Sequence, residues 1–199
     1  MLPFYQTELP EAGCDEAGRG CLAGPVFAAA VILPPDFYHE DLNDSKQMSL
    51  AARERLREVI EREALAWSVQ AVSVDEIDKI NILKASMLGM HRALLDLNHP
   101  PGLILVDGNR FIPFQKIPHQ CMVKGDGKYA AIAAASVLAK THRDAYMLAL
   151  HTQFPQYDWQ QNKGYPTEAH REAIRQHGPC IHHRRSFRLL PEGEQLRMW

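Results

Sequence analysis

The sequence has no apolar segment that approaches the roughly 20 residues needed for a membrane-spanning helix. Its first residues, MLPFYQTELPEAG, also lack the basic start and the apolar centre of a secretion signal. Both absences argue against a membrane protein or an exported one. We therefore expect the protein to remain in the cytoplasm, without contact with a membrane.

Cysteine is scarce, and its spacing matches neither a common metal site nor a disulfide framework. The sequence contains no C-x-x-C pair among its four cysteines, Cys14, Cys21, Cys121 and Cys180. Without an export signal, we expect four reduced thiols. The histidines that lie near Cys180 in the sequence also fit no usual zinc spacing, so a zinc site is not expected.

A large excess of one charge is missing as well. The formal net charge of −2 argues against nucleic-acid binding by bulk charge alone. The charge is unevenly distributed, however, because the range 163–188 contains six Lys and Arg residues, two Glu and four His. This local excess predicts a basic surface that faces phosphates.

The 199 residues, 46% of them apolar, are enough for one domain with a substantial core. Short apolar runs predict strands at Val26–Leu33, Leu65–Val74, Leu103–Val106 and Gln120–Val123. Helical patterns cover 49–63, 75–97 (a short helix, then a longer one from about Asn81), 128–150 and 167–177. Strands first, and then strands alternating with helices, favour a mixed α/β sheet.

Acidic residues accompany three of the apolar segments. Asp15 and Glu16 open the stretch Gly13–Val26, whose other residues are mostly small or apolar. Asp107 and Asp126 each follow a short, strand-like apolar run. An acid at the end of a buried strand faces the crevice where α/β sheets bind their ligands.

If these four carboxylates met, they would stay ionised together only around divalent cations. Hard oxygen ligands select Mg²⁺ or Mn²⁺, and two such ions suit the hydrolysis of a phosphodiester. The alternative is that the four acids are separate turn residues and helix caps. The periodicity of the sequence does not decide between these interpretations.

The predicted helix at 128–150 carries a polar stripe on an otherwise apolar circumference. A sector of about 100° contains Asp126, Tyr129, Ser136, Lys140, Arg143 and Asp144. The Ser, Lys and Arg of this stripe could hold successive phosphates, and the alternative is an ordinary solvated face. Asp144 either competes with Asp126 for a role in the site or forms an ion pair with Lys140.

Three other polar segments are candidates for binding. In Gly18-Arg19-Gly20, a cation lies between two flexible residues, so backbone groups could approach a sugar or phosphate closely; the alternative is a simple loop. Tyr165, between Gly164 and Pro166, can stack on a sugar or base, or pack its own loop. The cluster 43–46 is typical of an exposed turn, and the range 182–186 of a phosphate-facing basic patch.

Seven motifs, in this order and spacing, closely resemble those of ribonuclease HII, the bacterial type 2 ribonuclease H. They are DEAGRG with LAGPV (15–26), NDSK (43–46), LVDGN (105–109), KGD (124–126), AAASVLAKTHRD (133–144), NKGYPT (162–167) and HHRRSF (182–187). The resemblance runs from about Gly13 to Phe187. It implies a ribonuclease H-like mixed sheet flanked by helices, with a core at about 11–155, a helical C-terminal extension at about 156–190 and a flexible tail at 191–199.

The resemblance also implies an activity and a set of residues. The activity is endonucleolytic cleavage of RNA in RNA–DNA hybrids and at single ribonucleotides in duplex DNA, leaving 3′-hydroxyl and 5′-phosphate ends, in DNA replication or ribonucleotide repair. The implied metal-binding carboxylates are Asp15, Glu16, Asp107 and, in preference to Asp144, Asp126. Gly18, Arg19 and Gly20 match the segment that senses the 2′-hydroxyl, and Tyr165 matches a tyrosine that packs on the following deoxyribose. The implied phosphate contacts, with less certain individual roles, are Lys46, Ser136, Lys140, Arg143 and Arg184.

Two other functions compete with this interpretation. One is a divalent-metal phosphodiesterase with a similar core, such as a hybrid nuclease without junction specificity. The other is a catalytically silent binding module, although four intact acids near phosphates would weaken binding. Gln195–Trp199 (QLRMW) resembles the short tails that dock on replication sliding clamps, and the alternative is packing on its own domain. We expect a monomer.

Overall fold

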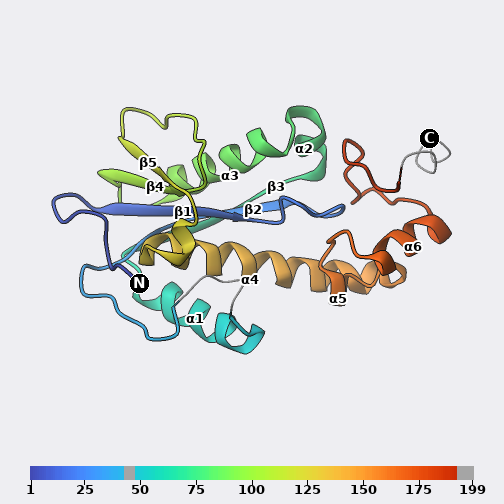
Figure 1. Cartoon of the computed structure of the whole chain (residues 1–199), viewed down its shortest axis with the longest axis horizontal. Coiled ribbons are helices and arrows are strands. Elements are labelled where there is room, and N and C mark those ends of the chain that lie inside the picture. Colours follow the sequence, from blue (N-terminus) through green and yellow to red (C-terminus); the bar gives the residue numbers. More distant parts are fainter. Residues whose placement is uncertain (43–47, 192–199) are drawn as a thin grey trace.

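The computed structural model describes residues 1–42 and 48–191, and a five-stranded sheet forms their centre (Figure 1). The strands are β1 (Glu11–Ala17), β2 (Val26–Ile32), β3 (Ala66–Val72), β4 (Leu103–Asp107) and β5 (His119–Met122), in the order β3-β2-β1-β4-β5. Strands β1, β2 and β3 pair antiparallel, whereas β4 and β5 run parallel to β1. The predicted mixed α/β sheet is confirmed.

Helices cover both faces of the sheet, because alternate residues of β2 are apolar on both sides. Ala29 and Val31 pack in one cluster with α1 (Leu50–Glu63) and α4 (Ala130–Gln153). Ala28 and Ala30 pack in another with α3 (Ile82–Asp96), which follows α2 (Val74–Ile80). Figure 1 shows the two pairs of helices on opposite sides of β1 and β2.

Helix α4 approaches β1 unusually closely, and small residues on both elements permit this. A Cβ added to Gly13 would lie 2.1 Å from the carbonyl carbon of Ala131, so a side chain at position 13 would push the helix away. All residues of α4 from Ala130 to Ala139 are buried, and most of them are alanines. Because these residues are small, α4 packs closely on β1, and its side chains lie next to this strand.

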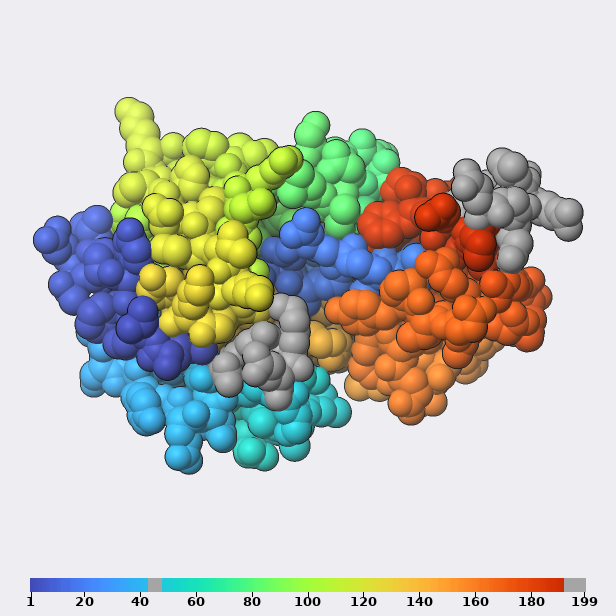
Figure 2. All heavy atoms as spheres, viewed as in Figure 1, coloured from blue at the N-terminus to red at the C-terminus, as the bar shows by residue number. Residues whose placement is uncertain are grey.

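The C-terminal region packs against the distal half of α4 (Figure 1). It contains η2 (Pro155–Tyr157), α5 (Trp159–Asn162) and α6 (Glu168–His177). A separate apolar cluster joins Trp159 and Ile174 to Met147 and Leu150 of α4, and also to Leu22 in the loop after β1. The predicted helical C-terminal region is therefore present, and the loop between β1 and β2 lies against it. Figure 2 shows the orange and red atoms of this region next to blue atoms from the first part of the chain.

Most element boundaries agree with the sequence pattern because capping residues fix them. Ser49 accepts a hydrogen bond from the Ala52 amide, and Thr167 accepts one from the His170 amide. Strand β3 ends before the predicted Val74, since Ser73 begins a capping box with Glu76. Helix α4 begins at Ala130 rather than at the predicted residue 128, after the short η1 (Gly125–Gly127). The short elements η1, η2 and α5 were not predicted.

Candidate active site

The ends of neighbouring parallel strands bring three acidic side chains together. The register between β1 and β4 pairs Cys14 with Val106, so the next residues, Asp15 and Asp107, are also neighbours. Strand β5 lies beside β4, and η1, which follows it, carries Asp126. One carboxylate oxygen from each of the three acids lies within 4.8 Å of the others. The predicted convergence is therefore present for these three residues.

The surroundings of Asp15 disfavour its charge unless a cation is bound. Asp15 is 4% exposed, and burial raises its pKa well above the ordinary value, with further increases from the charges of Glu16 and Asp107. Hydrogen bonds from Ser136 and from the Glu16 amide act in the opposite direction. The amide of Gly125 donates to Asp107 Oδ1 at 2.8 Å. Three close oxygen ligands of this kind fit a divalent hard cation, whose charge would offset their mutual repulsion.

The side chain of Glu16 is not part of the cluster that the three aspartates form. Alternation along β1 directs it away from the side of Asp15, and its Oε1 accepts a hydrogen bond from Arg19 Nη1 at 3.0 Å. It does not belong to the group of oxygens that lie within 4.8 Å among the described residues. Its metal-binding role stays a prediction.

Asp144, the competitor of Asp126 in the sequence, has a different partner. Its Oδ1 lies 2.6 Å from Lys140 Nζ, one turn earlier on α4. The ion pair that was the alternative for Asp144 is therefore present, and Asp126 is the acid that joins Asp15 and Asp107.

A cavity of about 430 Å³ opens beside the acids and gathers most of the other predicted residues. Its walls are formed by Asp15, Glu16, Ala17, Gly18, Arg19, Gly20, Asp107, Ser136, Lys140 and Tyr165. Tyr165 is one of the lining residues, with Lys140 Nζ 5.6 Å from the centre of its ring. The segments that supply these walls are far apart in the sequence and meet through the pairing of β1 with β4 and the packing of α4 and the C-terminal region around β1 and the loop after it.

Two predicted phosphate contacts, Arg143 and Arg184, lie behind this cavity rather than in its wall. Arg143 is completely buried and donates to the carbonyls of Ala23, Pro25 and Lys163 at 2.8–3.1 Å. Arg184 is also completely buried and donates to the carbonyls of Arg19 and Gly24, both at 3.0 Å. In this structure both guanidinium groups hold the loop between β1 and β2, and their contact with phosphates stays a prediction.

The burial of these residues corrects two expectations. The stripe on α4 is not a solvated face, because Ser136, Arg143 and Asp144 are all at most 4% exposed. The range 182–186 is not uniformly an exposed basic patch, since His183 and Arg184 are buried whereas Arg185 is exposed. Ser136 is buried because α4 packs on β1, where Ser136 donates to Asp15, whereas the C-terminal region packs onto the distal half of α4. Lys46 and Gln195–Trp199 lie outside the described residues.

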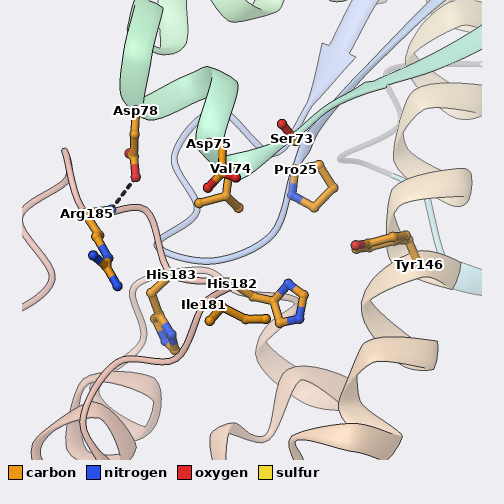
Figure 3. A pocket seen from close by; sticks show the side chains of 10 residues that line it. All are labelled: Pro25, Ser73, Val74, Asp75, Asp78, Tyr146, Ile181, His182, His183 and Arg185. Carbon is orange, nitrogen blue, oxygen red and sulfur yellow. Dashed lines mark hydrogen bonds between the residues drawn. The ribbon is translucent and has the colours of Figure 1, made fainter.

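A second, larger cavity of about 620 Å³ lies between α2, α4 and the loop that contains His182 and His183 (Figure 3). On its α2 side, Asp78 accepts hydrogen bonds from the amides of Arg185 and Ser186 at 2.9 and 3.0 Å. No local pattern in the sequence predicts this contact, because residues 107 positions apart form it. Through these hydrogen bonds, Asp78 connects α2 to the C-terminal loop.

Comparisons with known proteins agree with the motifs and the fold. A protein-family model described as Ribonuclease HII matches residues 12–190. The chain is 65% identical over 192 residues to a Ribonuclease HII of Parabacteroides distasonis, covering 96% of each chain.

Two solved structures are also similar. The ribonuclease H2 from Pyrococcus horikoshii OT3 gives a TM-score of 0.77 at 25% identity, over 94% of this chain and 98% of that one. The RNase HII in a complex with PCNA from Archaeoglobus fulgidus gives a TM-score of 0.75 at 26% identity, over 92% of this chain and 97% of that one. These similarities extend over the sheet, the helices and the C-terminal region together.

Proposed function

This chain belongs to the ribonuclease HII family, and from that premise we propose that it hydrolyses RNA within nucleic-acid duplexes at the cavity beside Asp15 and Asp107. Membership supports a divalent-metal-dependent endonuclease of the ribonuclease H type. We further propose that the substrates are the RNA strand of RNA–DNA hybrids and single ribonucleotides embedded in duplex DNA. The products are 3′-hydroxyl and 5′-phosphate ends.

One observation carries this proposal. Asp15 and Asp107, two of the three clustered aspartates, line the same cavity as Gly18, Arg19, Gly20 and Tyr165. A site that cuts next to a ribonucleotide needs a hydrolytic centre and a means of recognising the sugar, and only the 2′-hydroxyl distinguishes RNA from DNA at one position. Residues suited to both tasks line one cavity of about 430 Å³, and this supports the proposal.

The acids fit Mg²⁺ or Mn²⁺, and Asp15, Asp107 and Asp126, with Glu16 at the rim, would hold two ions. Such ions supply Lewis-acid stabilisation of the charge that develops on the phosphate, and activation of water. The protein's own contribution is to fix the carboxylates: Ser136 and the Glu16 amide donate to Asp15, and the Gly125 amide donates to Asp107. Rigid ligands preserve the geometry on which this chemistry depends.

The remaining walls of the cavity would recognise the substrate. The backbone of Gly18 and Gly20, on either side of Arg19, can approach the ribose closely enough to test for its 2′-hydroxyl. Tyr165 offers the face of its ring to the next sugar, and Lys140 provides a cation for the phosphate between them. Phosphate contacts would set the position of the duplex in the cavity, whereas the sugar contacts would select the bond that is cut.

The test is incubation with a DNA duplex that contains one ribonucleotide, with and without Mg²⁺ or Mn²⁺, followed by mapping of the cut. We expect metal-dependent cleavage at that ribonucleotide. Cleavage of a continuous hybrid alone would favour a hybrid nuclease without junction specificity. Binding of both duplexes without cleavage in either metal would favour a silent binding module and would contradict the proposal.

We also propose a docking role for Gln195–Trp199. The Archaeoglobus RNase HII, 26% identical to this chain, was solved in a complex with PCNA. An apolar and aromatic peptide end of this kind suits a groove on a sliding clamp. Capture by the cognate clamp should be lost when residues 195–199 are removed, and equal capture with and without them would refute the proposal.

A monomeric state and a cytoplasmic location stay predictions. Among the helices of the described residues, none is long and apolar enough to cross a bilayer.

A further inference from the structure

A buried pair of histidines lies directly behind the loop that carries Tyr165. His170 on α6 is 0% exposed, and His183 in the C-terminal loop is 1% exposed. Their Nε2 atoms are 3.2 Å apart, and the other ring nitrogen of His170, Nδ1, lies 2.9 Å from the Tyr165 carbonyl oxygen. Figure 3 shows His183 at the edge of the second cavity, on the C-terminal loop.

The partners of the two rings assign a direction to each hydrogen bond. The amide of Cys180 donates to His183 Nδ1 at 3.0 Å, so this nitrogen has no proton and His183 donates from Nε2. Trp159 Nε1, which can only donate, contacts His170 Nε2 at 3.0 Å. His170 therefore accepts at Nε2, shared between the two donors, and donates from Nδ1 to the Tyr165 carbonyl.

Both rings must be neutral for this chain of hydrogen bonds to exist, and their surroundings favour that state. Burial lowers the pKa of His183 to about 3, with a further decrease from His170. Burial also lowers the pKa of His170, and the nearby charge of Arg171 lowers it further, whereas the hydrogen bond to the Tyr165 carbonyl raises it. The directional chain is thus maintained at neutral pH.

Tyr165 is held at its backbone by several hydrogen bonds, and its ring lies beside the cations of Lys140 and Arg143. Its amide donates to the Asn162 carbonyl at 2.8 Å, and its carbonyl accepts from the Thr167 amide at 2.8 Å in addition to His170. The preceding Gly164 adopts a φ of +83° and contacts the backbone so closely that a Cβ would lie 2.6 Å from the Ala23 carbonyl oxygen. Tyr165 is 37% exposed, and it lines the cavity.

We propose that His170 is a positioning residue for substrate recognition. By donating from Nδ1 to the Tyr165 carbonyl, it fixes the Tyr165 backbone, and thereby holds the ring in the position where it stacks on the sugar beside a single ribonucleotide. His183 and Trp159 serve this purpose indirectly, because they set the tautomer of His170. The inference rests on the proposed function and deepens it. It assigns to a buried histidine of the C-terminal region an effect on catalysis at the opposite wall of the cavity.

Three variants at one position separate the hydrogen bond from simple packing. His170→Asn retains a donor at the position of Nδ1, His170→Gln places its polar group near Nε2 instead, and His170→Phe retains only a ring. The measurement is kcat/KM on a duplex with one embedded ribonucleotide, after thermal unfolding has shown each variant to be folded. His177→Phe, at the exposed end of the same helix, serves as the control.

We expect His170→Asn to remain within about threefold of the wild type, and His170→Gln and His170→Phe to lose about tenfold in kcat/KM. Combined with Tyr165→Ala, His170→Phe should cause no further loss, because it acts through the residue already removed. Equal activity of the Asn and Gln variants, or an additive loss in the double variant, would overturn the inference. If His170→Phe does not fold, the comparison of Asn with Gln decides alone.

The wild-type protein separates this inference from the proposed function. If the wild type leaves the single-ribonucleotide duplex uncut in either metal, the proposed function is wrong. If the wild type cuts that duplex and the Gln variant cuts it equally well, only the role of His170 is wrong.

Discussion

Gly18 lies directly against the guanidinium group of Arg143: a Cβ built on Gly18 would be only 2.0 Å from Nε of that side chain. Arg143 donates hydrogen bonds to the carbonyls of Ala23 and Pro25 in the same loop. Gly18 adopts a φ of +95° where it contacts Arg143. The loop that would recognise the ribose therefore packs directly on a buried cation, and its first glycine is required both by the contact and by the backbone conformation.

Gly18→Ala should mainly distort the loop between β1 and β2. The added methyl group collides with Arg143, and the left-handed backbone conformation costs about 1–3 kcal/mol for a residue other than glycine. We expect a loss of at least tenfold in kcat/KM on the single-ribonucleotide duplex and a measurable decrease in the free energy of unfolding. Gly20→Ala is the matched control for stability, because a Cβ there meets nothing within 4 Å; equal destabilisation by both changes would contradict this explanation.

Arg143→Met should destabilise the fold strongly. It leaves the carbonyls of Ala23, Pro25 and Lys163 without their buried donor, and each unpaired group costs about 1–3 kcal/mol. We expect the free energy of unfolding in urea to fall by about 3 kcal/mol or more. Arg110→Met, at an exposed position, should change it by less than about 0.5 kcal/mol. A stable Arg143→Met protein would show that the guanidinium does not support the loop.

Asp107→Asn should abolish cleavage while leaving the binding of a hybrid intact. The substitution retains an oxygen that can accept from the Gly125 amide but removes one charge from the cluster with Asp15 and Asp126. It should also lower the pKa of Asp15, because the charge of Asp107 is one of the causes that raise it. Single-turnover cleavage, fluorescence anisotropy with a hybrid, and NMR titration of the Asp15 carboxyl would measure the three effects. Wild-type turnover would remove Asp107 from the site.

The sequence allowed the positions of these acids to be predicted because their signal is local. Asp107 and Asp126 each follow a short apolar run, and the end of a strand is where ligands bind in such sheets. Their convergence depended on the strand order β1-β4-β5, which no local pattern contains. The family resemblance supplied that information in advance, and the register of β1 against β4 now accounts for it.

Arg143 and Arg184 illustrate what the sequence could not reveal. Both occur in polar motifs, and an arginine on a helix is ordinarily solvated. Their burial follows from the packing of the C-terminal region over α4, and most of their partners are carbonyls more than a hundred positions away, such as those of Pro25 and Gly24. Side-chain periodicity contains no signal for a backbone carbonyl so remote in the chain.

Tyr165→Ala should lose cleavage at single embedded ribonucleotides, because the stacking surface on the cavity wall is removed. Tyr165→Phe keeps that surface and should retain activity within about threefold. Cleavage rates on the single-ribonucleotide duplex, measured for both variants beside the wild type, provide the check. If the alanine variant cuts at the normal rate, the proposed role in reading the junction is wrong.

His183 should make the protein less stable in mild acid. Burial lowers its folded-state pKa to about 3 from the ordinary value of 6.5, so between these two values the unfolded chain binds more protons than the folded protein. Stability therefore falls as the pH decreases through this window, by about 2 kcal/mol between pH 7 and pH 5 for this group alone.

The raised pKa of Asp15 acts in the opposite direction, since its folded form takes up a proton more readily and gains stability as the pH decreases. The contribution of His183 is therefore isolated by comparing two proteins rather than two pH values. His183→Gln can still donate to His170 but no longer titrates. In urea denaturation, the wild type should lose about 2 kcal/mol more than this variant between pH 7 and pH 5. Parallel losses in both proteins would mean that His183 is protonated in the folded state near pH 6, and the directional chain of hydrogen bonds to Tyr165 could not then persist in mild acid.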